Sequence, residues 1–132
     1  MNTKDIRNAM KAQLLGGAVA DTAWPNVKDS GTTPRLEVEF TGVRQEGGTL
    51  KGNEVHYEEG TMMVIVAAAK GGGTDAGLDL AGAVAARFPE GSRLTITGGT
   101  VTIMARPDIR GGFPDDTNYR IPVAIRYRAR NT

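Results

Sequence analysis

The closing segment of the chain alternates apolar and polar side chains with a period of two, and this feature restricts the fold most. From Tyr119 to Tyr127 every odd-numbered residue is aromatic or β-branched, whereas the even-numbered positions from 120 to 128 are Arg, Pro, Ala, Arg and Arg. This pattern predicts a β-strand with one buried face and one wet face. Pro122 lies within the segment and has no N–H group to donate to a ladder. It therefore predicts that this strand lies at a sheet edge, at least locally.

Three further regions have strand patterns. Residues Arg35 to Thr41 alternate in the same way, and Thr61 to Ala69 is apolar on both faces. The second pattern is typical of a central strand that is covered on both sides. The β-branched segments 94–97 and 100–103 flank Gly98 and Gly99, which predicts a hairpin with its two-residue turn at these glycines.

Two segments have helical periodicity. Ile6, Met10 and Leu14 recur at intervals of four, which predicts a helix with one apolar stripe over residues 5–15. A second helix is expected from Thr74 to Phe88, because the segment is rich in alanine and follows a glycine run. The alanines would let this helix lie close against a sheet.

Together these elements predict an α+β fold in a single domain, residues 1–132. We expect a mainly antiparallel sheet with two helices packed on one face and an extended hairpin or loop near residues 43–60. A chain of 132 residues can bury one sufficient core by packing alone, and this chain has no cysteine. The large side chains expected in the core are Trp24, Phe40, Phe88 and Tyr119.

The formal net charge of +1 hides an asymmetry along the chain. Residues 1–86 carry eight basic and eleven acidic side chains, whereas residues 87–132 carry eight arginines and four acidic side chains. Opposite charges of this kind can attract within a subunit or between subunits; otherwise both sets are solvated surface charge. The groups singled out as a candidate interface are Glu46, Glu54, Glu58, Glu59, Arg120, Arg126 and Arg128.

The residue inventory argues against catalysis. His56 is the only histidine, and it lies in the loose acidic segment with no nucleophile motif at either serine. One histidine and no cysteine cannot supply a zinc site, and the nearby glutamates lack the spacing of a calcium loop. The run Gly71–Gly73 lacks the following lysine of a phosphate-binding loop. We therefore expect no enzyme activity, no cofactor and no metal.

The start of the chain and its hydropathy bear on location. Residues 1–5 lack the basic start of a signal peptide, and the most apolar stretch, residues 62–69, is too short to span a bilayer. The expectation is a protein made and used in a cytoplasm without membrane attachment.

Several segments, taken in order, resemble the phage tail terminator family, whose type member is the tail terminator of phage lambda. They are the opening helix Asp5–Leu15, the loop Ala23–Asn26, the strand Arg35–Phe40, the Gly-rich turn and helix Gly73–Phe88, and the closing strand Tyr119–Ala129. The resemblance implies a non-catalytic virion protein that forms a hexameric ring at the head-proximal end of the tail. Such a ring stops polymerisation of the tail-tube protein, presents a surface to the head connector and lets DNA pass through its lumen without sequence-specific binding.

Closed rings use heterologous interfaces, so each subunit needs two different complementary surfaces. One hypothesis is that the acidic segment, residues 46–59, meets the Arg-rich strand, residues 120–130, across the subunit boundary. Two other functions stay open: a head–tail connector or neck ring, and a small nucleic-acid-binding module that uses the C-terminal arginines.

Overall fold

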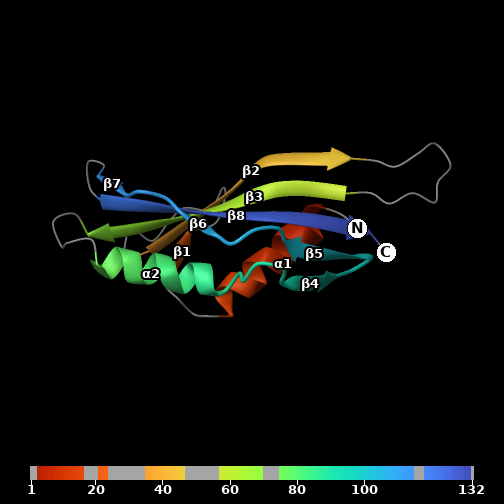
Figure 1. Ribbon diagram of the computed structural model, residues 1–132, viewed down its shortest axis with the longest axis horizontal. Coiled ribbons are helices and arrows are strands. Elements are labelled where there is room, and N and C mark those ends of the chain that lie inside the picture. The colour runs from red at the N-terminus through yellow and green to blue at the C-terminus, as the bar shows by residue number, and fades with distance from the viewer. Residues whose placement is uncertain are drawn as a thin grey trace.

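The computed structural model describes residues 3–16, 21–23, 35–46, 57–69, 75–114 and 118–131. The described residues form one sheet and two helices, and the helices alternate with strands along the chain (Figure 1). In chain order they are α1 (Thr3–Leu15), β1 (Asp21–Ala23), β2 (Arg35–Glu46), β3 (Tyr57–Ala69), α2 (Asp75–Ala86), β4 (Arg93–Ile96), β5 (Gly99–Ile103), β6 (Asp108–Ile109), β7 (Phe113–Pro114) and β8 (Asn118–Asn131).

The sheet is built around two long antiparallel strands, β3 and β8. They pair in continuous register from Tyr57↔Arg130 to Ala69↔Asn118. The strand order is β1-β2-β3-β8-β5-β4, and the short β6 and β7 also pair with β8. This confirms a mainly antiparallel sheet within an α+β fold; the exception is β1, which runs parallel to β2.

The prediction that the closing strand lies at an edge is wrong. β8 has β3 along one side and β5, β6 and β7 along the other. Pro122 is accommodated because it lies between the two short pairings, which involve residues 119–120 with β7 and 123–124 with β6. On that side Pro122 contributes its carbonyl oxygen, which accepts from the Arg110 N–H at 2.9 Å.

The described ends of the segment predicted as an extended hairpin or loop, residues 43–46 and 57–60, are paired antiparallel strands; residues 47–56 lie outside the described residues. β2 continues to Glu46 and β3 begins at Tyr57, with the pairs Arg44↔Glu59 and Glu46↔Tyr57. The register shifts between Thr41 and Arg44, and Gly42 there has a φ of 62°. This is a β-bulge, which bends the strand and increases its twist. We call β2 beyond the bulge, with the start of β3, the arm.

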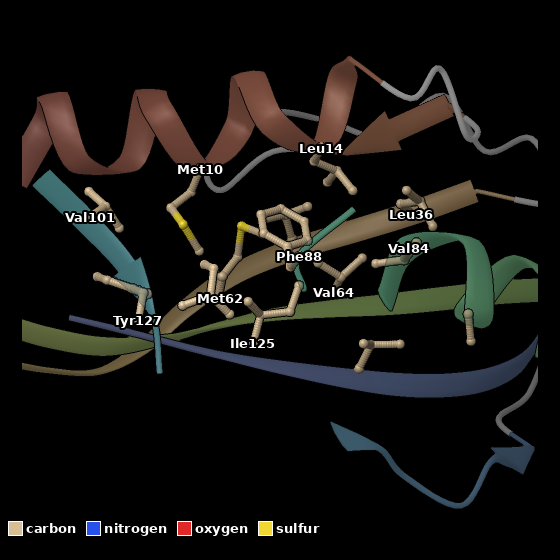
Figure 2. Packing of buried hydrophobic residues seen from close by; sticks show 14 of the residues in the cluster. Met10, Leu14, Leu36, Met62, Val64, Val84, Phe88, Val101, Ile125 and Tyr127 are labelled. Carbon is tan, nitrogen blue, oxygen red and sulfur yellow. The ribbon is translucent and has the colours of Figure 1, made fainter. Parts of the chain in front are cut away.

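Both helices lie on the same side of the sheet (Figure 1). α1 buries Ile6, Met10 and Leu14, as its apolar stripe predicts. In Figure 2 Met10 and Leu14 of α1 point towards Phe88 and towards core residues of β3 and β8. Odd-numbered residues of β8 form the floor of this core, with Ile121, Val123, Ile125, Tyr127 and Ala129 all almost completely buried.

The core prediction is confirmed for Phe88, which is fully buried, and Phe40 and Tyr119 pack partly buried against the same cluster. Trp24 lies outside the described residues. α2 approaches the sheet closely at Gly77, where a Cβ would come within 2.9 Å of Ile121 Cδ1. The small residues of this helix therefore serve the close packing that its composition predicts.

One turn prediction needs correction. The β4–β5 hairpin pairs Ile96 with Gly99, so its two turn residues are Thr97 and Gly98 rather than the two glycines. Gly98 takes a φ of 77°, which a glycine adopts at no steric cost. Between β5 and β8 the chain forms the short strands β6 and β7, whose backbone groups pair with β8.

Candidate interaction surface on the open face of the sheet

One face of the sheet has no helix over it, and we call it the outer face. Because the β3 segment is apolar on both faces, its sequence predicts that both faces of this strand are covered. In the described residues the helices cover only the face of Met62, Val64 and Val66. On the outer face Met63 and Ile65 are half-buried. They lie in register with Ala124 and Pro122 of β8, so a short apolar strip runs across the middle of the outer face.

Charged side chains lie in register at the arm end of this strip. Arg44, Glu59 and Arg128 occupy one row across β2, β3 and β8, and the row continues through Thr102 of β5 to Arg93 of β4. The Glu59 carboxylate lies 3.4 Å from Arg44 Nη2 and 3.1 Å from Arg128 Nε. One carboxylate therefore serves two guanidinium groups within a single chain.

The neighbouring rows continue the same chemistry. Tyr57, Arg130, Thr100 and Thr95 lie in one row, and the Arg128 guanidinium stacks on the Tyr57 ring at 3.9 Å. On the other side, Arg126 lies opposite Thr61. We call these three rows, with their arginine and threonine side chains, the arginine–threonine face.

A second charged cluster lies at the opposite end of the strip. Glu37 Oε2 accepts a hydrogen bond from Arg120 Nη1 at 2.6 Å and forms an ion pair with Arg35 Nη2 at 3.2 Å. Arg35, Ala67 and Arg120 are in register across three strands. Because Ala67 is small, the two guanidinium groups can converge on one carboxylate.

The face beneath the helices holds a buried polar cluster at the start of α1. Glu58 is 1% exposed, and its Oε1 accepts from Thr3 Oγ1 at 2.5 Å and from Gln45 Nε2 at 2.8 Å. Within the described part of the chain, Glu58 Oε2 and the Tyr127 hydroxyl have no hydrogen-bond partner. Burial and the Glu58 carboxylate, against an opposing effect of Arg7, raise the pKa of Tyr127 to about 12.

The predicted interface residues thus have different positions. Glu58 must be withdrawn from that set, because its side chain is buried under its own α1 and cannot reach a partner. Glu59 and Arg128 meet within one chain, as do Arg120 and Glu37. Arg126 is exposed on the outer face. Glu54 lies outside the described residues, and for Glu46 the structure places only the backbone, opposite Tyr57.

Four residues of these clusters were missed by the sequence reasoning: Arg35, Glu37, Arg44 and Tyr57. The alternation of residues 35–41 does place Arg35 and Glu37 on the wet face, so that signal was available. The position of Arg44 opposite Glu59 and the contact of Tyr57 with Arg128 of β8 were not, because they depend on the bulge and on the strand register.

The described residues contain no candidate metal-binding cluster. No group of three or more His, Asp and Glu side chains there could hold a metal ion. Among the same residues no helix is long and apolar enough to cross a membrane. His56 and Gly71–Gly73 fall outside the described ranges. A groove between α2 and β6 is lined mainly by small apolar residues, including Gly82, Ala85 and Pro107.

The helices cover one face of the sheet, and the charged and apolar side chains of the other face are available for contacts with other molecules. This arrangement is typical of a protein that acts through surface contacts. A family model described as phage tail terminator protein matches residues 5–127. The chain therefore belongs to the phage tail terminator family, and it is a structural protein of the phage tail.

Solved structures share the fold at low sequence identity. One, whose title states no function, has a TM-score of 0.72 at 20% identity, covering 98% of this chain and 96% of its own. Another belongs to a structure titled as the virion of a native gene transfer agent particle, with a TM-score of 0.62 at 17% identity, covering 97% of this chain and 96% of its own. A search of curated proteins gave no significant match.

Proposed function

We propose that this protein caps the head-proximal end of the tail tube as one subunit of a hexameric ring. The observation that carries the proposal is the family match over residues 5–127. In this function the ring ends polymerisation of the tube protein and offers its other side to the head connector. DNA passes through the lumen without sequence-specific binding.

The surface geometry supports an assembly function. The apolar strip at Met63 and Ile65 belongs to a strand whose sequence is typical of burial on both faces, while the helices cover one face only. A subunit in a closed ring presents two different surfaces to its neighbours. The outer face and the groove beside α2 are two such unlike surfaces.

The contacts within one chain leave fewer residues for charge pairing between the acidic segment and the Arg-rich strand of neighbouring subunits. Arg128 and Glu59 already pair with each other, so they are weak candidates for contact across a subunit boundary. Arg126 is exposed and forms no ion pair with the described side chains, so it stays a candidate for contact with a partner. Glu46 and Glu54 also stay in the proposed set.

Two experiments test this function. Negative-stain imaging of the purified protein should show closed rings, and a phage lacking the gene should make tails of abnormal length. Tails of normal length that fail to join heads would contradict termination and favour a connector function instead. Monomeric protein at all concentrations, together with normal tails, would overturn both.

A further inference from the structure

We infer that the arginine–threonine face is a contact surface for the phosphate backbone of duplex DNA. This inference adds a site to the proposed ring and rests on that function only for its biological setting. The binding itself depends on the face of a single chain, so it can be tested apart from ring formation.

The charge of this face is strongly one-sided. Among the side chains that the structure describes there, five are arginines and one is acidic: Arg44, Arg93, Arg126, Arg128, Arg130 and Glu59. A second acidic residue, Glu46, lies opposite Tyr57, and only its backbone is described. Glu59 is engaged with two of these arginines. The whole chain has a net charge of only +1, so the excess is a property of this surface and not of the composition.

Three of the arginines face solvent. Arg93, Arg126 and Arg130 are exposed, and among the described residues none of them forms an ion pair with an acidic side chain. Strand pleating holds them on one face, since residues two apart on a strand share a side. Their charges are therefore presented together to whatever lies over the sheet.

The other polar groups on the face suit phosphate oxygens. Thr61, Thr95, Thr100 and Thr102 lie in the same rows as the arginines, and Thr102 lies between Arg128 and Arg93. Arginine and threonine side chains are common donors to DNA phosphates, and arginine forms bidentate pairs with them. Apart from Tyr57, whose ring is covered by Arg128, no aromatic side chain of the described residues lies in these rows. A surface for stacking unpaired bases would need such rings, so the face fits duplex backbone better than single strands.

The dimensions of the face match several phosphates at once. Five neighbouring strands contribute to the central row, so at roughly 4.8 Å between strands the row is about 19 Å wide. Duplex DNA carries one charge for about every 1.7 Å of axis, so several phosphates lie within reach of this row. No base-reading element projects from the face in the described strands, and contact of this kind is independent of sequence.

The test uses the full-length protein and a fluorescent duplex DNA of arbitrary sequence, with binding measured by anisotropy over a series of salt concentrations. Wild-type protein should bind at low salt, and log affinity should fall linearly with log salt concentration. The double variant Arg126→Gln with Arg130→Gln should bind several-fold more weakly. Its salt slope should be shallower by about two, because each lost phosphate contact removes about one.

The matched control removes the same charge from elsewhere on the surface. Lys4 on α1 and Arg106 beside the α2 groove are both exposed. Lys4→Gln with Arg106→Gln should leave the salt slope unchanged. Equal weakening by the two double variants would overturn the inference, as would failure of the wild-type protein to bind at low salt.

Two further outcomes separate this inference from neighbouring ones. Polyglutamate serves as a second ligand in the same assay. If it binds as tightly as DNA, and the double variant loses affinity for both equally, the inference of a DNA site is overturned in favour of an acidic protein partner. Sedimentation of each variant records whether rings form. Intact rings without DNA binding would overturn this inference alone, whereas DNA binding without rings would support it and count against the proposed function.

Discussion

Glu58 and Glu59 are neighbours in the chain and have opposite environments. Because side chains of a strand alternate between faces, Glu58 lies beneath α1 and Glu59 lies on the outer face. Glu58 accepts two hydrogen bonds through one oxygen, while Glu59 pairs with two arginines near solvent. A buried carboxylate with one oxygen lacking a partner in the described chain is the less favourable arrangement, since burial of charge has a high desolvation cost.

Glu58 therefore offers a sharp contrast between two substitutions. Glu58→Gln keeps an oxygen for Thr3 and Gln45 and removes the buried charge, so it should leave the free energy of unfolding unchanged or raise it. Glu58→Ala leaves both donors without their acceptor and should cost about 1–3 kcal/mol. Urea unfolding measures both. Equal destabilisation by the two variants would show that the charge itself is needed.

Tyr127 gives a prediction on pH. Its pKa is raised from 10.0 to about 12, chiefly by burial. Since the folded value lies above the unfolded one, the native state holds this proton more tightly. The contribution to stability is full below about pH 10 and is lost as pH rises towards 12. Tyr127→Phe has no such proton. The free energy of unfolding of wild type should therefore fall relative to that of the variant from about pH 10 upward. Parallel pH profiles of the two proteins in urea unfolding would contradict this prediction. Because the Glu58 charge raises the pKa of Tyr127, Glu58→Gln should lower that pKa.

The elements that sequence predicts well are the long ones. Periodicity identifies α1, α2, β2 and β8, because burial of one face imposes it, and a continuous apolar run identifies β3. The two- and three-residue strands β1, β6 and β7 carry no usable period, and they exist because backbone groups of passing segments pair with a neighbouring strand. The position of Pro122 was misjudged for the same reason: a gap between two short strands tolerates it inside the sheet.

The candidate surface could be predicted only in part. Alternation in the sequence places Arg120, Arg126 and Arg128 together on the wet face of one strand. Their partners come from β2, β3, β5 and β4, and alternation says nothing of which strand lies beside which. The pairing of Glu59 with Arg128 joins residues far apart in the chain, so it follows from sheet order and register.

Two glycines of α2 test how closely this helix packs. At Gly82 a Cβ would meet nothing within 4 Å, so Gly82→Ala should stabilise the fold by up to about 1 kcal/mol through helix propensity. At Gly77 the added methyl would come within 2.9 Å of buried Ile121, so Gly77→Ala should gain less than Gly82→Ala or destabilise. Thermal unfolding compares the pair. An equal gain at both positions would contradict close contact of α2 with β8.

The two sides of the whole sheet differ in what their side chains contact. The helix side contains the core, from Met10 of α1 to Phe88 after α2, and provides stability (Figure 2). The outer face carries the apolar strip and the two charged clusters and is available for contacts. Mutations on the helix side should therefore change unfolding first, whereas mutations on the outer face should change assembly or DNA binding at nearly constant stability.

The Glu59–Arg128 pair tests this division, because it lies on the outer face but closes a contact within one chain. The single variants Glu59→Gln and Arg128→Gln and their combination form a double-mutant cycle in urea unfolding. Both side chains are about one-third exposed, so solvent screening limits the expected coupling to about 0.2–1 kcal/mol. An intrachain pair gives the same coupling at every protein concentration, whereas a pair between subunits gives a coupling that grows as rings form. Coupling that appears only at high concentration would return these two residues to the subunit boundary.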